Sequence, residues 1–218
     1  MNLTKSSIND VLSSISRSDV FLTKIGIDLV ADKNRMLSEV FVEKNIDVNS
    51  TLATLDLIGE VSDEDLHWLL EPTANLINHI KSRYHCRHRI QLPQLISLAK
   101  QVENNHQGNP FCPVGLTGYL NDLHEDLLVH MEREEQILFP FLCEKKMSYV
   151  FMQVSLAMHN HDHDIHALNR IDELTNELVV PQDADEIWKK LYLELAVFKT
   201  DLLEHVRLEN DILFEKCH

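Results

Sequence analysis

The sequence is poor in residues that interrupt helices, with only 5 glycines and 6 prolines among 218 residues. Alternating β-branched runs are also few, which argues against an all-β fold and predicts helices nearly throughout. No apolar run approaches the roughly 18 residues that cross a bilayer, and the first residues lack the basic and apolar regions of a signal peptide. We therefore expect a cytoplasmic protein without a membrane partner.

Cysteine is scarce and is never clustered. Zinc ribbons and thiol redox sites need close cysteine pairs, so neither is predicted. Basic residues are outnumbered by acidic ones, 20 against 35, and the net charge of −15 would repel nucleic acid and anionic membranes. The four single cysteines are Cys86, Cys112, Cys143 and Cys217.

The helical patterns divide the chain into parts. Short patterns with serine caps and a break at Gly26 predict a small helical N-terminal domain over residues 1–60. An acidic stretch beginning at residue 59 predicts a linker over 61–72. Residues 73–218 hold four long amphipathic patterns with short connections, which predict an antiparallel four-helix bundle.

Local signals suggest where the four long helices begin. We expect helix starts at Thr73, near Thr117 and Ser148, and after the aspartates of the VVPQDAD segment. The turn-rich segment 104–115 is expected to be a loop. Pro93 lies inside the first helix and should bend it or distort its hydrogen bonding.

One helical phrase occurs twice, as DLLVHMEREEQILF at 126–139 and DLLEHVRLENDILF at 201–214. Both copies contain Asp-x3-His-x3-Glu, and spacings of four put these polar side chains on one helical face. The apolar residues, Ile137 among them, place that polar row beside or within the buried stripe. Most His-x3-Glu pairs are surface contacts, but buried ones must be hydrogen-bonded or metal-bound, because their desolvation costs several kcal/mol.

Histidine is abundant, with 13 residues, and the other two predicted helices carry the clusters HCRH and HNHDHDIH. His85 lies 45 residues before His130, and His161 lies 44 before His205. The bundle therefore looks like one helical hairpin used twice, with one histidine from each first helix and a His-x3-Glu from each second helix. His163 remains an alternative to His161.

Four histidines and two glutamates at the centre of a bundle suit two first-row metal ions, because imidazole binds such metals and carboxylates on facing helices bridge them. Two octahedral ions have about twelve ligand positions, of which the glutamates fill about four, the imidazoles about four and a bridging oxygen about two. About one position per metal stays open, so we expect a reactive site. The repeat predicts near-equivalent surroundings for the two metals.

These motifs resemble a known family, the hemerythrin-like di-iron proteins that repair iron-sulfur clusters after nitrosative and oxidative stress, called RIC, YtfE or ScdA proteins. The resemblance covers essentially the whole chain and is most specific in RYHCRHRIQLPQL, LTGYLNDLHEDLLVHMEREEQILFP and DLLEHVRLENDILF. It implies an all-α, hemerythrin-like four-helix bundle with two oxo- or hydroxo-bridged iron ions, manganese and zinc being alternatives. The metal ligands that it implies are His85, His130, Glu134, His161, His205 and Glu209.

Two further expectations concern the surroundings of this site. His88, Asp126 and Asp201 are candidates for orienting a ligand imidazole through its other nitrogen, with ordinary core or surface roles as the alternative. The family commonly carries a Cys-Cys pair in its N-terminal domain, where this chain has Val30 and Ala31. A function that depends on those thiols is therefore not expected.

The resemblance implies repair of damaged iron-sulfur clusters by iron donation, by reaction with nitric oxide, or by both. Its partners would be proteins with damaged clusters and the small ligands nitric oxide and dioxygen. If the protein is an enzyme, the expected activity is that of a di-iron nitric oxide reductase. The alternative is a hemerythrin-like sensor or carrier that binds dioxygen or nitric oxide reversibly. The sequence leaves open whether the chain forms a homodimer and what residues 1–60 do.

Overall fold

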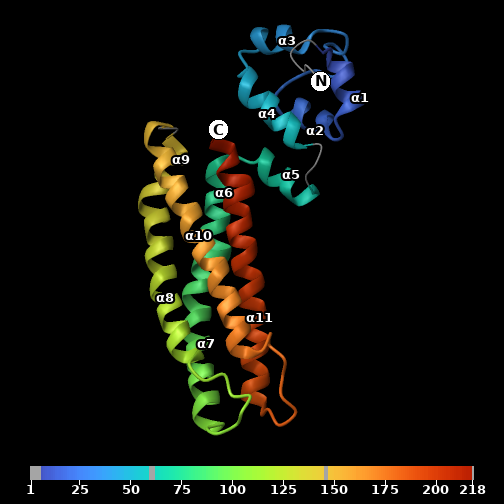
Figure 1. Cartoon of the computed structure of the whole chain (residues 1–218). Coiled ribbons are helices and arrows are strands. Elements are labelled where there is room, and N and C mark those ends of the chain that lie inside the picture. The colour runs from blue at the N-terminus through green and yellow to red at the C-terminus, as the bar shows by residue number, and fades with distance from the viewer. Residues whose placement is uncertain (1–5, 59–61, 145–146, 218) are drawn as a thin grey trace. The chain divides into compact units, whose positions relative to one another are not determined.

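The computed structural model describes residues 6–58, 62–144 and 147–217. Over these residues the regular secondary structure is helical, with one isolated bridge between Ser7 and Met36, and the predicted all-α fold is confirmed (Figure 1). The chain divides into two compact units, Met1–Pro72 and Thr73–Cys217. No helix in the described ranges combines the length and hydropathy that a bilayer crossing requires.

The N-terminal unit is built from short helices around its own core. Ser7 caps the first helix in a reciprocal capping box with Asp10. Fully buried apolar side chains from several helices form the core, among them Leu22, Phe41 and Leu55. The helices are α1 (Ile8–Ser14), α2 (Ser18–Lys24), α3 (Leu37–Glu43), α4 (Val48–Ile58) and α5 (Asp63–Leu70).

The segment 61–72, which was expected to be a linker, instead forms helix α5 over most of its length. Its N-cap is Ser62, whose side chain accepts a hydrogen bond from the backbone N–H of Asp65. Leu66 is buried in the N-terminal core. The acidic composition suggested a linker, but a serine cap followed by an apolar stripe favours a helix that packs within the N-terminal unit.

Val30 and Ala31, which stand where the family has its cysteine pair, lie in an exposed turn. The Oδ1 atom of Asp28 accepts hydrogen bonds from the backbone N–H groups of Val30 and Ala31, at 2.9 and 3.0 Å. The Val30 side chain is 89% exposed. Asp28 therefore holds the turn, and the two positions present apolar side chains to solvent.

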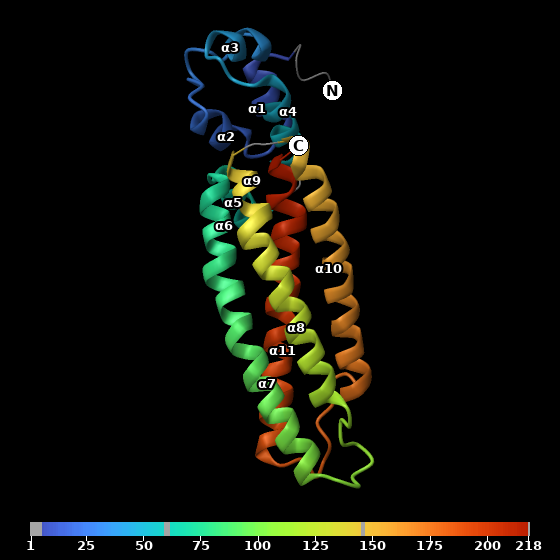
Figure 2. The same cartoon turned by 90° about the vertical axis from the view of Figure 1, so that its left-hand side faces the viewer.

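Four long helical segments form the second unit and run side by side (Figures 1 and 2). Their positions along the chain agree with the four predicted helices. The first contains α6 (Thr73–Ile80), the π-helix η2 (Lys81–His85) and α7 (Cys86–Asn105); the second contains α8 (Leu116–Arg133), the π-helix η3 (Glu134–Leu138) and α9 (Phe139–Glu144); the third is α10 (Met147–Thr175); the fourth contains α11 (Glu186–Arg207) and the π-helix η4 (Leu208–Leu213), followed by the 3-10 turn η5 (Glu215–Cys217).

The helix caps agree with the sequence in part. Asp185 caps α11 by accepting a hydrogen bond from the backbone N–H of Trp188, as the aspartates there suggested. Thr117 was expected to cap α8, but the N-cap is Gly115 at φ 93°. Glycine adopts this left-handed conformation without the steric penalty of a side chain, so the chain turns two residues earlier than predicted.

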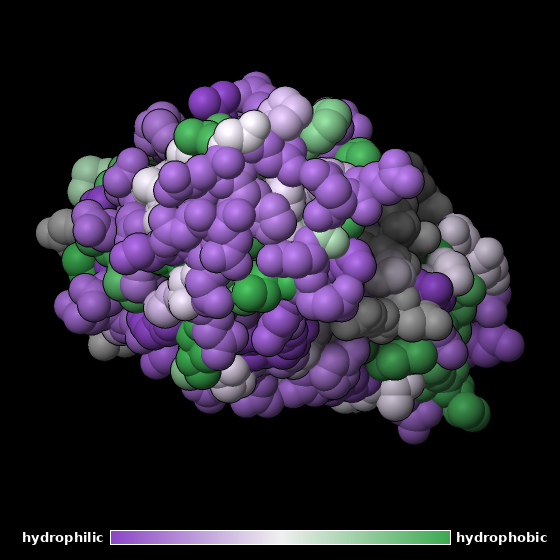
Figure 3. Space-filling model, turned by 90° about the horizontal axis from the view of Figure 1, so that it is seen from below, coloured by the Kyte–Doolittle hydropathy of each residue, from purple (hydrophilic) through white to green (hydrophobic). Residues whose placement is uncertain are grey.

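The core of the bundle runs along the inner faces of all four long segments. Trp188, Phe198 and Leu195 are fully buried, and leucines from α7 and α8 pack against them. Seen from the end that carries the loops after α7 and α10, the surface is mainly hydrophilic with scattered apolar residues (Figure 3). The apolar faces of the helices are thus buried against one another. The interior also contains buried polar side chains, among them His85, Glu134 and Glu209.

Three of the four long segments change from α-helix to π-helix at one level of the bundle, at η2, η3 and η4. A π-turn inserts an extra residue into the helical register and is common at functional sites. Pro93 does not cause the change in the first segment, because α7 continues through it and η2 ends eight residues earlier. Each π-helix contains one of the predicted metal ligands: His85, Glu134 or Glu209.

Candidate metal centre

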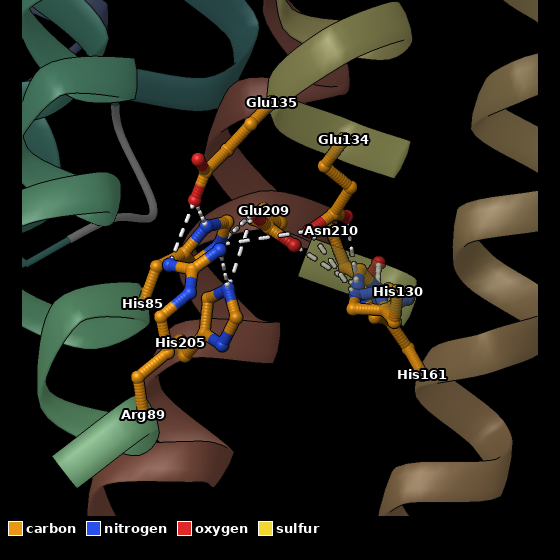
Figure 4. Close-up of polar contacts among 9 residues, drawn as sticks. All are labelled: His85, Arg89, His130, Glu134, Glu135, His161, His205, Glu209 and Asn210. Atoms are coloured by element: carbon orange, nitrogen blue, oxygen red, sulfur yellow. Dashed lines mark hydrogen bonds and ion pairs between the residues drawn. The ribbon is translucent and has the colours of Figure 1, made fainter. Parts of the chain in front are cut away.

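The six predicted ligand side chains converge at the level of the π-helices (Figure 4). All of them are at most 5% exposed. They form two groups that share both glutamates, and within each group the candidate ligand atoms lie within 4.8 Å of one another. One group is His85, Glu134, His205 and Glu209, and the other is His130, Glu134, His161 and Glu209.

The group around His85 has the spacing of a metal shell. The Nε2 atoms of His85 and His205 lie 3.0 Å apart, and the Nε2 of His205 lies 3.2 Å from Oε1 of Glu209. Two adjacent ligands that are each about 2.1 Å from one octahedral metal lie about 3.0 Å from one another. The donor atoms therefore already stand at the separation that a shared metal ion would give them.

The group around His161 is built in the same way. The Nε2 of His161 lies 2.9 Å from Oε2 of Glu209, and the Nε2 of His130 lies 3.2 Å from Oε2 of Glu134. Glu209 thus turns Oε1 to one group and Oε2 to the other. This is the arrangement of a carboxylate that bridges two metals.

Several donor atoms of the cluster are buried without a hydrogen-bond partner. They are both carboxylate oxygens of Glu134 and Glu209, both ring nitrogens of His130, and Nε2 of His161. Buried polar atoms are normally hydrogen-bonded, because an unpaired one costs the free energy of its desolvation. Metal ions would satisfy these atoms together, so the residues present fit a metal pair.

The carboxylates of Glu134 and Glu209 also need positive charge nearby. Burial opposes the charged form of His161, but the adjacent carboxylates of Glu134 and Glu209 raise its pKa to about 11. Burial likewise opposes ionisation of Glu209, yet the surrounding histidines, His205 first, hold its pKa well below the ordinary value. Protons on imidazoles thus balance the carboxylates, and metal binding would replace those protons.

The outer nitrogens of two rings have hydrogen-bond partners that the sequence predictions missed. The Nδ1 of His85 lies 2.7 Å from Oε1 of Glu135, which also accepts a hydrogen bond from Arg89 at 3.0 Å (Figure 4). The Nδ1 of His161 lies 2.7 Å from Oδ1 of Asn210. A partner on Nδ1 fixes the tautomer that leaves Nε2 as the metal donor.

A signal for these two residues was present in the sequence. Glu135 directly follows Glu134, and Asn210 directly follows Glu209, so the two residues occupy the same position in the two copies of the phrase. In the structure each contacts the histidine that comes from the first helix of its own hairpin. Alignment of the copies beyond His-x3-Glu would have identified both.

The terminal phenylalanine of each copy has a corresponding role. Phe139 stacks on His85 with ring centroids 5.7 Å apart, and Phe214 stacks on His161 at 5.9 Å. Both phenylalanines are buried. Each copy of the phrase therefore supplies a hydrogen bond and an aromatic face that hold the histidine of the preceding helix.

His88, Asp126 and Asp201, which were candidates for orienting a ligand imidazole, do not contact the outer nitrogens of the cluster histidines in the way that the sequence suggested. Asp201 is buried but contacts Arg83, Arg87 and Gln91, and the Nδ1 of His205 has no hydrogen-bond partner. One helical turn separates the two side chains along the axis, and the carboxylate of Asp201 contacts the two arginines instead of the ring.

Asp126 is exposed, and both ring nitrogens of His130 lack a hydrogen-bond partner, so it does not orient that ring. His88 is fully buried and contacts Oε1 of Gln91 through Nδ1 at 3.2 Å. Burial, with the nearby His205, lowers the pKa of His88 to about 3, so its ring is neutral. His88 packs beside His205 with ring centroids 5.4 Å apart.

The choice between His161 and His163 on α10 is clear from their positions. His161 is fully buried and belongs to the cluster, whereas His163 is exposed. Asp164, which was not predicted, is also buried, and one of its carboxylate oxygens has no hydrogen-bond partner. Burial raises the pKa of Asp164 to about 6.

Comparison with known proteins agrees with this site. Residues 76–217 match the family described as Hemerythrin HHE cation binding domain. The chain is 37% identical to the iron-sulfur cluster repair protein YtfE of Escherichia coli O81 (strain ED1a) over 210 residues, covering 96% of this chain and 95% of the relative.

A second relative is the iron-sulfur cluster repair protein YtfE of Dickeya chrysanthemi (strain Ech1591). It is 32% identical over 217 residues, covering 100% of this chain and 98% of the relative. The similarity thus includes the N-terminal unit as well as the bundle. From the family match and these near full-length similarities, the chain belongs to the hemerythrin HHE cation binding domain family, in its iron-sulfur cluster repair branch.

Proposed function

We propose that this protein is a non-haem di-iron protein that supports the repair of iron-sulfur clusters damaged by nitrosative and oxidative stress. The observation that carries the proposal is the pair of buried groups with two shared glutamates, whose four carboxylate oxygens lack a hydrogen-bond partner. The curated relatives, which are named iron-sulfur cluster repair proteins, support the choice of repair.

In this proposal the two glutamates would hold both metals, and each metal would be held by two imidazoles. His85 and His205 serve one metal, and His130 and His161 serve the other. The pairing crosses the two hairpins, because each metal takes one histidine from each of them. Both hairpins must therefore be packed together before either position is complete.

The protein's own groups prepare the site for metal. Glu135 and Asn210 hold the outer nitrogens of His85 and His161, which keeps their Nε2 atoms directed inward. The aromatic rings that stack on these histidines shield them from solvent. When bound, iron supplies open coordination positions for a small ligand and, as ferrous ion, a cargo that can be given up.

Two routes to repair fit this site: donation of ferrous iron to a protein with a damaged cluster, and reaction with nitric oxide that would otherwise attack clusters. The two routes differ in what leaves the protein. Iron donation empties the site. Reduction of two nitric oxide molecules to nitrous oxide and water would take two protons and two electrons, one electron from each ferrous ion, and would leave the oxidised iron in place; further turnover would need an added reductant. Metal analysis and gas analysis after exposure to each substrate therefore separate them.

The first test is anaerobic reconstitution of the full chain with ferrous iron, with about two irons per chain expected. The loaded protein is then incubated with an iron-sulfur dehydratase that nitric oxide has inactivated. Recovery of dehydratase activity above that obtained with the same amount of free ferrous iron supports the proposal. A chain that binds no iron, or a loaded chain that gives no recovery and consumes no nitric oxide, contradicts it.

A further inference from the structure

A pocket of about 380 Å³ opens beside one half of the cluster, between α8 and α10. It reaches His130, whose two ring nitrogens have no hydrogen-bond partner. A much smaller cavity, about 10 Å³, lies next to it and is lined by His130 and Glu134. The pocket thus connects the surface with the His130–His161 half of the cluster. Side chains able to bind metal around it are Asp126, His130, His159, His163 and Asp164.

Two of these side chains form a helical histidine pair. His159 and His163 are four residues apart on α10, and their ring centroids are 5.1 Å apart. Histidines at this spacing share one helical face and can bind one metal ion together. Both are exposed, so an ion could reach them directly from solvent.

Asp164 gives the pocket a buried acidic group. Asp164 is one of the residues that line the pocket, its side chain is only 6% exposed, and its buried Oδ2 atom has no hydrogen-bond partner. A buried carboxylate oxygen without a partner is costly, and a cation in the pocket would satisfy it. Asp126 is a second acidic residue of the lining, and Arg133 is its one arginine.

The other half of the cluster is enclosed differently. There Glu135 and Arg89 cover the outer side of His85. The Glu135 carboxylate accepts a hydrogen bond from Arg89 at 3.0 Å, whereas the corresponding partner of His161 is the neutral amide of Asn210. A carboxylate partner makes an imidazole a stronger metal donor than a neutral amide does. The metal at His85 and His205 should therefore be held more firmly than the metal at His130 and His161.

We propose that His159 and His163 bind one divalent metal ion beside this pocket, and that ferrous iron passes between this outer site and the His130–His161 position through the pocket, which Asp164 also lines. This inference rests on the proposed function, since it assumes that the inner cluster holds iron. It assigns the exchangeable iron to one half of the cluster and gives the exposed histidines of α10 a role.

Metal binding at the outer site is tested on the full chain after its inner positions have been filled with ferrous iron without oxygen. Equilibrium dialysis against Ni²⁺, which imidazole binds well, should add about one nickel per chain while the iron content stays constant. The double variant His159→Ala, His163→Ala should lose the added nickel. The matched control His124→Ala, His166→Ala removes two histidines that do not line the pocket and should keep it.

Passage through the site is tested by the rate of iron release to a ferrous chelator. We expect two phases of equal size, the faster one from the His130–His161 position. In His159→Ala, His163→Ala and separately in Asp164→Asn, the fast phase should slow by about tenfold, while the slow phase and the total iron stay unchanged. Circular dichroism of each variant checks that the helices are intact.

Each result decides something definite. If nickel does not bind, or if it binds but both release phases keep their rates in the variants, the outer site as a passage is overturned. In both cases an iron content of about two per chain leaves the proposed function standing. A chain that takes up no iron at the start would instead overturn the proposed function.

Discussion

Glu135 and Asn210 stand at the same position in the two copies of the repeated phrase, and each contacts the outer nitrogen of a cluster histidine at 2.7 Å. The two hairpins are therefore alike in geometry. They differ in charge, because Glu135 is a carboxylate held by Arg89 and Asn210 is a neutral amide. A repeat that makes two sites similar in shape can still make them unequal in affinity.

The sequence repeat predicted near-equivalent surroundings for the two metals, and this holds only for the inner donors. Each group has two histidines and shares both glutamates. Outside the rings, one half is closed by Glu135 and Arg89, and the other half borders an open pocket. The comparison suggests a firmly held metal beside an exchangeable one, and the following variants test this difference from its largest expected effect to its smallest.

The largest effect is expected from Glu209→Ala, because this side chain gives one oxygen to each half. Its loss should remove both metals and reduce iron after anaerobic reconstitution from about two per chain to nearly none. Iron analysis after desalting measures this. Glu132→Ala, an exposed position on the same type of helical segment, serves as the control and should bind normally. Full iron binding by Glu209→Ala would show that the carboxylate does not bridge.

A half-site effect is expected from His161→Ala, which removes a donor from one group only. The variant should retain about one iron per chain, at His85 and His205, and should lose the fast phase of release to a chelator. His163→Ala provides the comparison for iron content and should bind about two irons. Loss of both irons in His161→Ala would mean that the two halves fill only together.

The difference in metal affinity between the two halves is tested by exchanging a carboxylate and an amide of similar size at residues 135 and 210. Glu135→Gln should weaken the metal at His85 by about ten- to a hundredfold, because the ring loses its carboxylate partner. Asn210→Asp should strengthen the metal at His161 and slow its release. Competition with a chelator of known affinity gives both constants. The two variants should shift opposite phases, and a shift of the same phase in both would contradict unequal halves.

The smallest effect is expected from Arg89→Ala. Arg89 donates a hydrogen bond to Glu135 at 3.0 Å, and we expect it to act on the metal through that carboxylate. We expect the slow release phase to become a few times faster, with iron content unchanged. Arg170→Ala, on an exposed ion pair with Glu173, is the matched control. A loss as large as that of Glu135→Gln would mean that Arg89 controls the charge of Glu135 rather than its position.

Much of the fold and all six convergent side chains could be predicted from the sequence. Helical periodicity and the scarcity of glycine and proline gave an all-helical protein, because these signals act within a few residues. The spacing of His130 and Glu134, repeated at His205 and Glu209, predicted buried polar faces that meet. The residue types alone predict a polar site there, since buried His and Glu require either a hydrogen-bond partner or a metal.

Other features were missed because they depend on contacts between distant segments. The π-helices η2, η3 and η4 were not predicted, and each contains one side chain of the cluster. Ile137 was expected in the buried stripe but is 39% exposed, whereas its counterpart Ile212 is 2% exposed. The same letters in two copies therefore do not ensure the same burial.

The sequence by itself determined the helices, the repeated phrase and the types of donor available for metal. Only the tertiary structure decided that His85 pairs with His205 across the hairpins, that Glu135 and Asn210 hold the outer nitrogens, and that a pocket opens beside His130. The physical reason is the separation along the chain of the residues that interact. Helix formation and polar spacing are local, whereas pairing of donors and access to solvent depend on how four helices pack.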